Sequence, residues 1–166
     1  MMGLGDIMFS TIPLSKNRKA NYGMCLDMAP HYIDPNEPLI TTLSNVSALL
    51  NFFMDNINWV GFYLYDDEKL YLGPFQGLPA CTEIQLGRGV CGLSAQTRET
   101  VIVKDVTAID DHIVCDGASR SEIVVPIVKD NKLIGVLDVD APVVNRFDEQ
   151  DKQLLEKIVA LIVDKL

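Results

Sequence analysis

The clearest periodic pattern in the chain lies between residues 38 and 55, in the segment PLITTLSNVSALLNFFMD. Its apolar positions are spaced alternately by four and three residues, which places them on one face of a helix. Pro38 suits the first turn of this helix. Backbone amides there have no hydrogen-bond partner within the helix, so the amide hydrogen that proline lacks is not missed. A second amphipathic helix is predicted at the C-terminus, with Asp148 as its N-cap. A weaker helix over Lys16–Met28 is predicted before these two.

After residue 56 the pattern changes from helical spacing to the alternation and β-branched composition that favour strands. Turn residues separate the strands, notably Asp66-Asp67-Glu68 and Asp130-Asn131. Gly87-Arg88-Gly89 is predicted to form a tight turn before a short helix over Val90–Thr97. The predicted strands are Ile57–Tyr65, Lys69–Phe75, Thr82–Leu86, Thr100–Val103, Ser121–Val128 and Lys132–Asp138. This order of elements predicts an α+β fold with an antiparallel sheet flanked by helices.

A long polar segment, Val106–Arg120, interrupts this order before the last two strands. Loops of this length in compact domains often carry function. The segment contains Cys115 and His112. Cys115 precedes a predicted strand, which suits an accessible nucleophile, whereas we interpret His112 as a loop residue.

Composition narrows the possible functions. The 166 residues are 48% hydrophobic, enough for one domain with a core, and the formal net charge of -9 with only 14 basic residues argues against nucleic-acid binding. The apolar runs are shorter than a membrane span requires, and the N-terminal residues do not resemble a secretory signal. We therefore expect a cytoplasmic protein that does not bind membranes.

Its four cysteines then form no structural disulfide framework, and singly they would be read as buried apolar residues. Without a CxxC pair or suitably spaced histidines, no zinc site is predicted.

Five segments of the sequence occur together in an order that is highly specific. They are NWVGFYLY (58–65), LGPFQG (72–77), GRGVCG (87–92), HIVCDGASRSEIVVPI (112–127) and IGVLDVDAP (134–142). In these segments the chain resembles the free methionine-(R)-sulfoxide reductases, which are GAF-domain enzymes. The resemblance implies a GAF-like fold with about six antiparallel strands, a single domain over residues 36–166 and a homodimer. Residues 1–35 form an N-terminal extension that matches poorly.

Reduction of a sulfoxide by thiols needs two cysteines that meet, a proton donor and a substrate pocket, but no metal or organic cofactor. The resemblance implies that Cys115 attacks the sulfur of free methionine sulfoxide and that Cys81 resolves the sulfenic acid as a disulfide. Cys91 matches a third reactive position and is the alternative for either role. Thioredoxin is the expected reductant of the disulfide.

Acidic and aromatic residues complete the predicted site. Asp138 and Asp140 are two residues apart at the end of a strand, so their side chains share a face, and Glu122 begins the neighbouring strand. Adjacent carboxylates repel each other, which a substrate ammonium would relieve, and one with a raised pKa could protonate the leaving oxygen. Trp59 and Tyr63 also share a face. By themselves they would be interpreted as core residues, but the resemblance places them around the substrate methyl group.

The main alternative is a non-enzymatic GAF module that senses a small ligand. Asn131-Lys132 and Phe147-Asp148-Glu149 loosely match a cyclic-nucleotide signature, but turns and helix caps use the same residues. This alternative leaves the three cysteines Cys81, Cys91 and Cys115 without a role.

Overall fold

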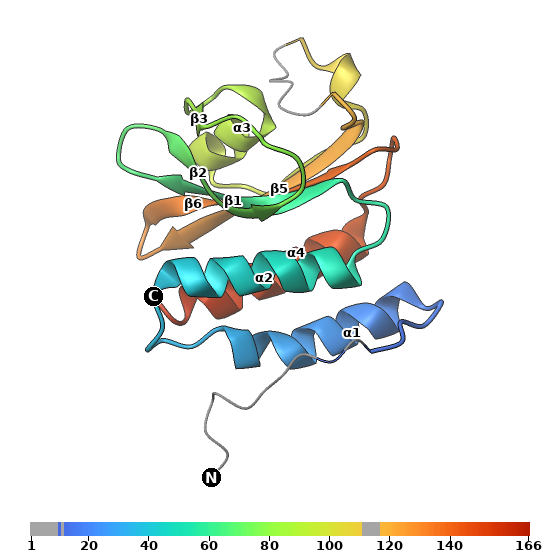
Figure 1. Cartoon of the computed structure of the whole chain (residues 1–166). Helices are drawn as coiled ribbons and strands as arrows, with labels where there is room; N and C mark the ends of the chain where they lie inside the picture. The colour runs from blue at the N-terminus through green and yellow to red at the C-terminus, as the bar shows by residue number, and fades with distance from the viewer. Residues whose placement is uncertain (1–9, 11, 111–116) are drawn as a thin grey trace.

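The structure, a computed structural model, describes residue 10 and residues 12–110 and 117–166. These residues form a layered arrangement in which a sheet separates the short helix α3 from the pair α2 and α4, with α1 beneath that pair (Figure 1). No helix within these ranges combines the length and apolar character that a membrane span needs. The elements are α1 (Arg18–Met28), η2 (Ala29–Tyr32), α2 (Leu39–Phe53), β1 (Trp59–Tyr65), β2 (Leu70–Gln76), β3 (Glu83–Ile84), α3 (Gly89–Thr97), β4 (Val101–Val103), η3 (Val106–Ala108), β5 (Ser121–Lys129), β6 (Lys132–Ala141) and α4 (Glu149–Val163).

The described strands form one six-stranded sheet in the order β3-β2-β1-β6-β5-β4, with every neighbouring pair antiparallel. The predicted antiparallel α+β architecture is therefore confirmed. The central strands β1 and β6 pair Trp59 with Asp140 and Gly61 with Asp138. Since directly paired residues point to the same face, this register brings the aromatic and acidic positions of the predicted site together.

The last strand is longer than the sequence pattern predicted. Asp138 was the expected end, but β6 continues through Asp140 to Ala141. Charged residues usually favour strand ends or turns, which is why the prediction stopped early. Here both aspartates keep their places in the ladder because β1 and β5 pair with β6 on either side of them.

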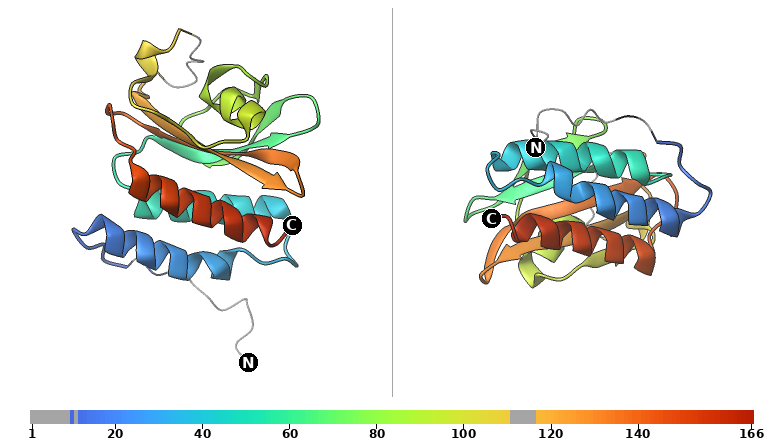
Figure 2. Two further views of the ribbon diagram at one scale, coloured as in Figure 1. Left: turned by 180° about the vertical axis from the view of Figure 1, so that it is seen from behind. Right: turned by 90° about the horizontal axis from the view of Figure 1, so that it is seen from below.

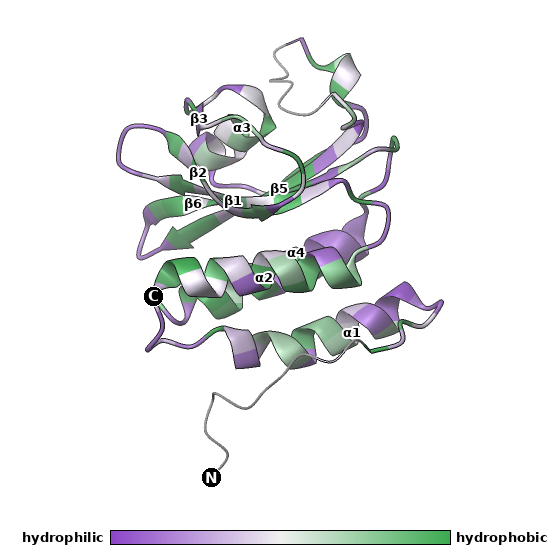
Figure 3. Ribbon diagram, viewed as in Figure 1, coloured by the Kyte–Doolittle hydropathy of each residue, from purple (hydrophilic) through white to green (hydrophobic). Residues whose placement is uncertain are grey.

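The sheet has a hydrophobic cluster on each face. The larger cluster lies between the sheet and the helices, and it includes Tyr22 and Cys25 of α1. Hydrophobic residues follow the strands and α2 in Figure 3. Viewed from below, α1 lies between α2 and α4 and covers both (Figure 2, right). Cys25 is fully buried there, as expected for a cysteine that acts as a buried apolar residue, and burial raises the pKa of its thiol to about 12.

A buried polar network ties α1 to the beginning of α4. The hydroxyl of Tyr22 donates to Oδ1 of Asp151 at 2.6 Å, and Nη1 of Arg146 donates to both oxygens of the same carboxylate at 3.0 and 3.1 Å. Arg18 of α1 also pairs with Asp151 and with Asp148. Because Asp151 has no exposed surface, its charge depends on these donors.

Tyr22→Phe should destabilise the chain without altering the sheet. The substitution removes one of the donors to a fully buried carboxylate, which typically costs about 1–3 kcal/mol. Urea unfolding followed by circular dichroism would measure the loss. Tyr71→Phe, at an exposed tyrosine, is the matched control. Equal stability of the two variants would show that the hydroxyl of Tyr22 contributes nothing to the docking of α1.

Candidate active site

Most of the predicted site residues lie on the sheet face opposite α2 and α4. Trp59, Asp140 and Glu122 form one row across β1, β6 and β5, because Asp140 pairs with both of the others. Asp138 lies in the next row, opposite Gly61. Three adjacent strands therefore bring together residues that are up to 81 positions apart in the chain (59 to 140).

Cys91 reaches this face from above the sheet. The predicted tight turn is confirmed: Gly87 and Gly89 have φ values of 79° and 61°, which glycine adopts without strain. α3 begins at Gly89, so Cys91 lies in its first turn. At Gly92 a Cβ would lie 2.3 Å from the carbonyl oxygen of Gln85, so only glycine lets the turn close this tightly.

The thiol of Cys91 meets two carboxyl groups beneath α3. One ligand-type atom each from Cys91, Glu122 and Asp138 lies within 4.8 Å of the others, and Sγ of Cys91 donates to Oε1 of Glu122 at 3.9 Å. The three residues are only 4, 5 and 5% exposed. Oδ1 of Asp138 is buried and has no hydrogen-bond partner among the described residues. We refer to Cys91, Glu122 and Asp138 as the thiol–carboxylate cluster.

The electrostatics of this cluster disfavour negative charge. Burial, together with the nearby Asp140, raises the pKa of Glu122 well above its usual range. Burial and Glu122 do the same to the pKa of Asp138, and burial and Asp138 raise the pKa of the Cys91 thiol. The cluster therefore favours the protonated forms of these groups, and a cation entering it would stabilise their ionised forms.

The aromatic residues form a stack beside the cluster. The rings of Trp59 and Tyr63 are 5.9 Å apart and inclined by 25°, and Phe75 of β2 stacks on Trp59 at 5.2 Å. Sequence reasoning did not select Phe75. The available signal was Gly61, which pairs with Phe75 and whose missing side chain leaves the space: a Cβ there would lie 2.3 Å from Cβ of Phe75. The hydroxyl of Tyr63 donates to the carbonyl oxygen of Cys81 at 3.1 Å, which links the stack to the second predicted cysteine.

The cysteines differ in their oxidation state. Cys81 is disulfide-bonded, whereas Cys25 and Cys91 are free thiols. Cys115 and His112 lie outside the described residues. The roles assigned to Cys115, Cys81 and Cys91 therefore stay predictions, as do those of the carboxylates and aromatic residues.

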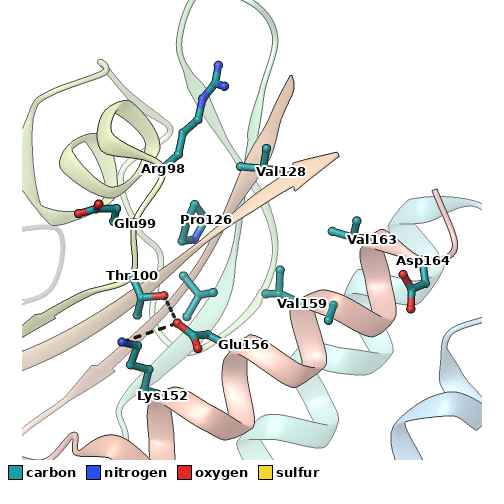
Figure 4. A pocket seen from close by; sticks show the side chains of 12 residues that line it. Arg98, Glu99, Thr100, Pro126, Val128, Lys152, Glu156, Val159, Val163 and Asp164 are labelled. Carbon is teal, nitrogen blue, oxygen red and sulfur yellow. Dashed lines mark hydrogen bonds and ion pairs between the residues drawn. The ribbon is translucent and has the colours of Figure 1, made fainter. Parts of the chain in front are cut away.

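A separate groove lies between the edge of the sheet and α4 (Figure 4). Its volume is about 660 Å³, and the hydroxyl of Thr100 donates to Oε1 of Glu156 across it at 2.7 Å. None of the predicted site residues within the described ranges lines it. Its walls are Arg98, Glu99, Thr100, Val125, Pro126, Val128, Lys152, Glu156, Val159, Ala160, Val163 and Asp164.

The raised pKa of Glu122 predicts that this residue destabilises the fold as pH rises. A carboxyl group with a raised folded-state pKa contributes stability below its ordinary pKa and loses it as pH rises through the folded-state pKa. Glu122→Gln should therefore match the wild type in Tm near pH 5 and exceed it by a few degrees near pH 8, since about 1 kcal/mol shifts Tm by roughly 2–4 °C in a chain of this size. Thermal unfolding of both proteins across this range would measure the difference.

The matched control for this pH series is Asp105→Asn. Hydrogen bonds from Thr107 lower the pKa of Asp105, so its contribution is lost only as pH falls below the range tested. A Tm difference between Glu122→Gln and the wild type that stays constant with pH would show that Glu122 ionises normally.

Comparisons with known proteins agree with the fold. The family model described as GAF domain matches residues 42–165. The free methionine-R-sulfoxide reductase of Escherichia coli is 50% identical over 121 residues, 73% of each chain. The structure of the fRMsr of Staphylococcus aureus in complex with substrate is 49% identical, covers 95% of this chain and 99% of its own, and has a TM-score of 0.83. The free methionine-R-sulfoxide reductase from Neisseria meningitidis, also in complex with its substrate, is 38% identical, covers 95% of both chains and has a TM-score of 0.89. The chain therefore belongs to the GAF domain family and, within it, to the free methionine-R-sulfoxide reductases.

Proposed function

We propose that this chain reduces free L-methionine-(R)-S-oxide to methionine with its own cysteines, and that thioredoxin then reduces the disulfide that forms. The protein acts in the cytoplasm, where thiols are kept reduced, and as a homodimer. The similarity to two reductases whose structures contain their substrate supports the choice of substrate. The proposed cysteine chemistry is inferred from the cysteines of this chain.

The thiolate of Cys115 attacks the sulfur of the sulfoxide, and the sulfoxide oxygen is transferred to the cysteine as its bond to the substrate sulfur breaks. Methionine leaves, and Cys115 becomes a sulfenic acid. The thiol of Cys81 then attacks the sulfenic sulfur, which forms the disulfide and releases the oxygen as water. The substrate sulfur is reduced by two electrons, the two thiols are oxidised by two, and a dithiol such as thioredoxin restores them.

The single observation that supports this function best is the buried Oδ1 of Asp138, which accepts no hydrogen bond from any residue that the structure describes. An ammonium group is a donor of the right charge for such an oxygen, and a free amino acid carries one next to its carboxylate. A methionine residue within a protein lacks this ammonium. Asp138, assisted by Asp140, therefore selects the free amino acid over peptide-bound sulfoxide.

Glu122 or Asp138, whose pKa values are raised, supplies the proton that the reaction requires. A carboxyl group that keeps its proton near neutral pH can donate it to the departing oxygen. When the substrate ammonium enters, it stabilises one ionised carboxylate of the pair. The other retains its proton and serves as the acid.

The same environment argues against Cys91 as the attacking group. The thiolate is the nucleophile, and burial beside Asp138 raises the pKa of Cys91. Cys115 is preferred because it belongs to the long polar segment rather than to the cluster. Trp59 and Tyr63 form the apolar wall for the substrate methyl group, since aromatic rings suit contacts with methyl groups and sulfur.

A coupled assay tests the function directly. Purified protein is supplied with thioredoxin, thioredoxin reductase, NADPH and free methionine-R-sulfoxide, and NADPH consumption is followed. We expect turnover with the free R epimer and none with the S epimer or with peptide-bound sulfoxide. Binding of a small ligand without any turnover by the reduced protein would instead favour the sensor-module alternative.

A further inference from the structure

The thiol–carboxylate cluster presents a donor set suited to a soft divalent cation. It combines one sulfur, from Cys91, with two oxygens, from Glu122 and Asp138, and each residue is at least 95% buried. Three different elements supply these donors, α3, β5 and β6, and the donor residues are 31 and 16 positions apart in the chain (91 to 122 and 122 to 138). This is why the spacing of cysteines and histidines along the chain gave no sign of a metal site.

The distance between the donors of Cys91 and Glu122 is close to that in a tetrahedral zinc site. Zinc bonds of about 2.3 Å to sulfur and about 2.1 Å to oxygen place a sulfur and an oxygen ligand about 3.6 Å apart. Sγ of Cys91 and Oε1 of Glu122 are 3.9 Å apart, and the whole set lies within 4.8 Å. Small side-chain rotations therefore suffice. The buried Oδ1 of Asp138, without a hydrogen-bond partner among the described residues, is a second, separate observation that favours a cation at this cluster.

We propose that Cys91, Glu122 and Asp138 bind Zn²⁺ reversibly and that the bound ion inhibits the reductase. Zinc replaces the proton of the Cys91 thiol and any proton on the carboxyl groups, and these protons pass to the buffer without a change in oxidation state. Calcium and magnesium are disfavoured, because both prefer six or more oxygen ligands and bind thiolates poorly.

Inhibition follows from the overlap between the ion and the substrate ammonium. Both need the carboxylate of Asp138, so zinc is a competitor of methionine sulfoxide. Inhibition rests on the proposed function of the site, whereas binding of the metal does not. The two parts therefore have separate tests.

Cadmium, a spectroscopic substitute for zinc, tests the binding. The disulfide form of the protein is titrated with Cd²⁺, and the ultraviolet charge-transfer band of the cadmium–thiolate bond is recorded. We expect one equivalent of Cd²⁺ to saturate the band, excess Zn²⁺ to displace it and excess Ca²⁺ to leave it unchanged. In the wild type, Zn²⁺ should also protect Cys91 from alkylation, as located by mass spectrometry.

Variants identify the ligands. Cys91→Ser should abolish the band, and Glu122→Gln and Asp138→Asn should each weaken binding about tenfold or more, in line with losses seen when metal environments are altered. Cys25→Ala is the matched control, because Cys25 is a buried thiol on the other face of the sheet, and it should bind Cd²⁺ as the wild type does. A band that persists in Cys91→Ser, or full affinity in both carboxyl variants, would overturn the site.

The inhibition is tested in the reductase assay with reductants that do not bind zinc. Zn²⁺ should raise the KM for methionine-R-sulfoxide without lowering kcat, and a chelator should restore the original value. Normal turnover at a zinc concentration that saturates the cadmium-competition titration would overturn the inhibitory role while leaving the metal site in place. Because the titration needs no catalysis, failure of the proposed function and failure of the zinc site are distinguishable.

Discussion

Cys115→Ser is expected to lose all measurable reduction of methionine-R-sulfoxide, even in a single turnover, whereas Cys91→Ser should retain the first turnover. Loss of an attacking thiol removes the covalent step itself, which we expect to cost roughly 10³-fold or more in rate. Burial beside Asp138 raises the pKa of Cys91, which favours its thiol over the nucleophilic thiolate. The measurement is methionine formed per enzyme when pre-reduced protein is mixed with less than one equivalent of substrate.

Cys81→Ser separates attack from resolution. This variant should release one methionine per enzyme and then stop, because its sulfenic acid has no partner thiol for the disulfide that thioredoxin reduces. Mass spectrometry would show the added oxygen on Cys115. Loss of the first turnover in Cys91→Ser, with Cys115→Ser still active, would reverse the assignment of the nucleophile.

Asp138→Asn should lower kcat/KM for the free amino acid by roughly 10²–10³-fold while making the protein more stable at neutral pH. Removing one partner of a buried charge pair typically costs about 3–5 kcal/mol, here the pair formed with the substrate ammonium. In the free protein, burial beside Glu122 raises the pKa of this carboxyl, which costs stability at pH values where the unfolded chain ionises it; an amide avoids that cost. Steady-state kinetics and thermal unfolding on the same samples would measure both effects.

Two controls make this result specific. Glu83→Gln removes an exposed carboxylate that pairs with Lys69, away from the cluster, and should leave kcat/KM unchanged. A methyl sulfoxide that lacks the amino group should react poorly with the wild type and lose little further with Asp138→Asn. If both substrates lost activity equally, Asp138 would act on the sulfoxide itself and not on the ammonium.

The sequence predicted the elements well because each carries a local periodic signal. The amphipathic pattern of residues 38–55 became α2, and the glycines around Arg88 predicted the turn before α3. Strand alternation alone predicted that Asp138 and Asp140 lie on one face of the sheet. The pairing of β6 with β1 and β5 confirms this placement.

What the sequence did not predict depends on contacts between elements distant in the chain. The approach of Cys91 to Glu122 spans 31 residues and depends on how α3 packs on β5 and β6. Phe75 joined the aromatic stack because a glycine on the neighbouring strand leaves room for it. The length of β6 was underestimated because its two aspartates resemble a strand end until their neighbours on both sides are known.

The position of α1 bears on how a working fragment of this protein should be chosen. The family match begins at residue 42, after α1, yet Tyr22, Cys25 and Ala29 belong to the same buried cluster as α2 and α4. A recombinant fragment that began at the edge of the match would expose to water the apolar surface that α1 covers. It would also leave Asp151 without the donors from Tyr22 and Arg18. Such a fragment would retain every residue assigned to the chemistry and still be prone to aggregate.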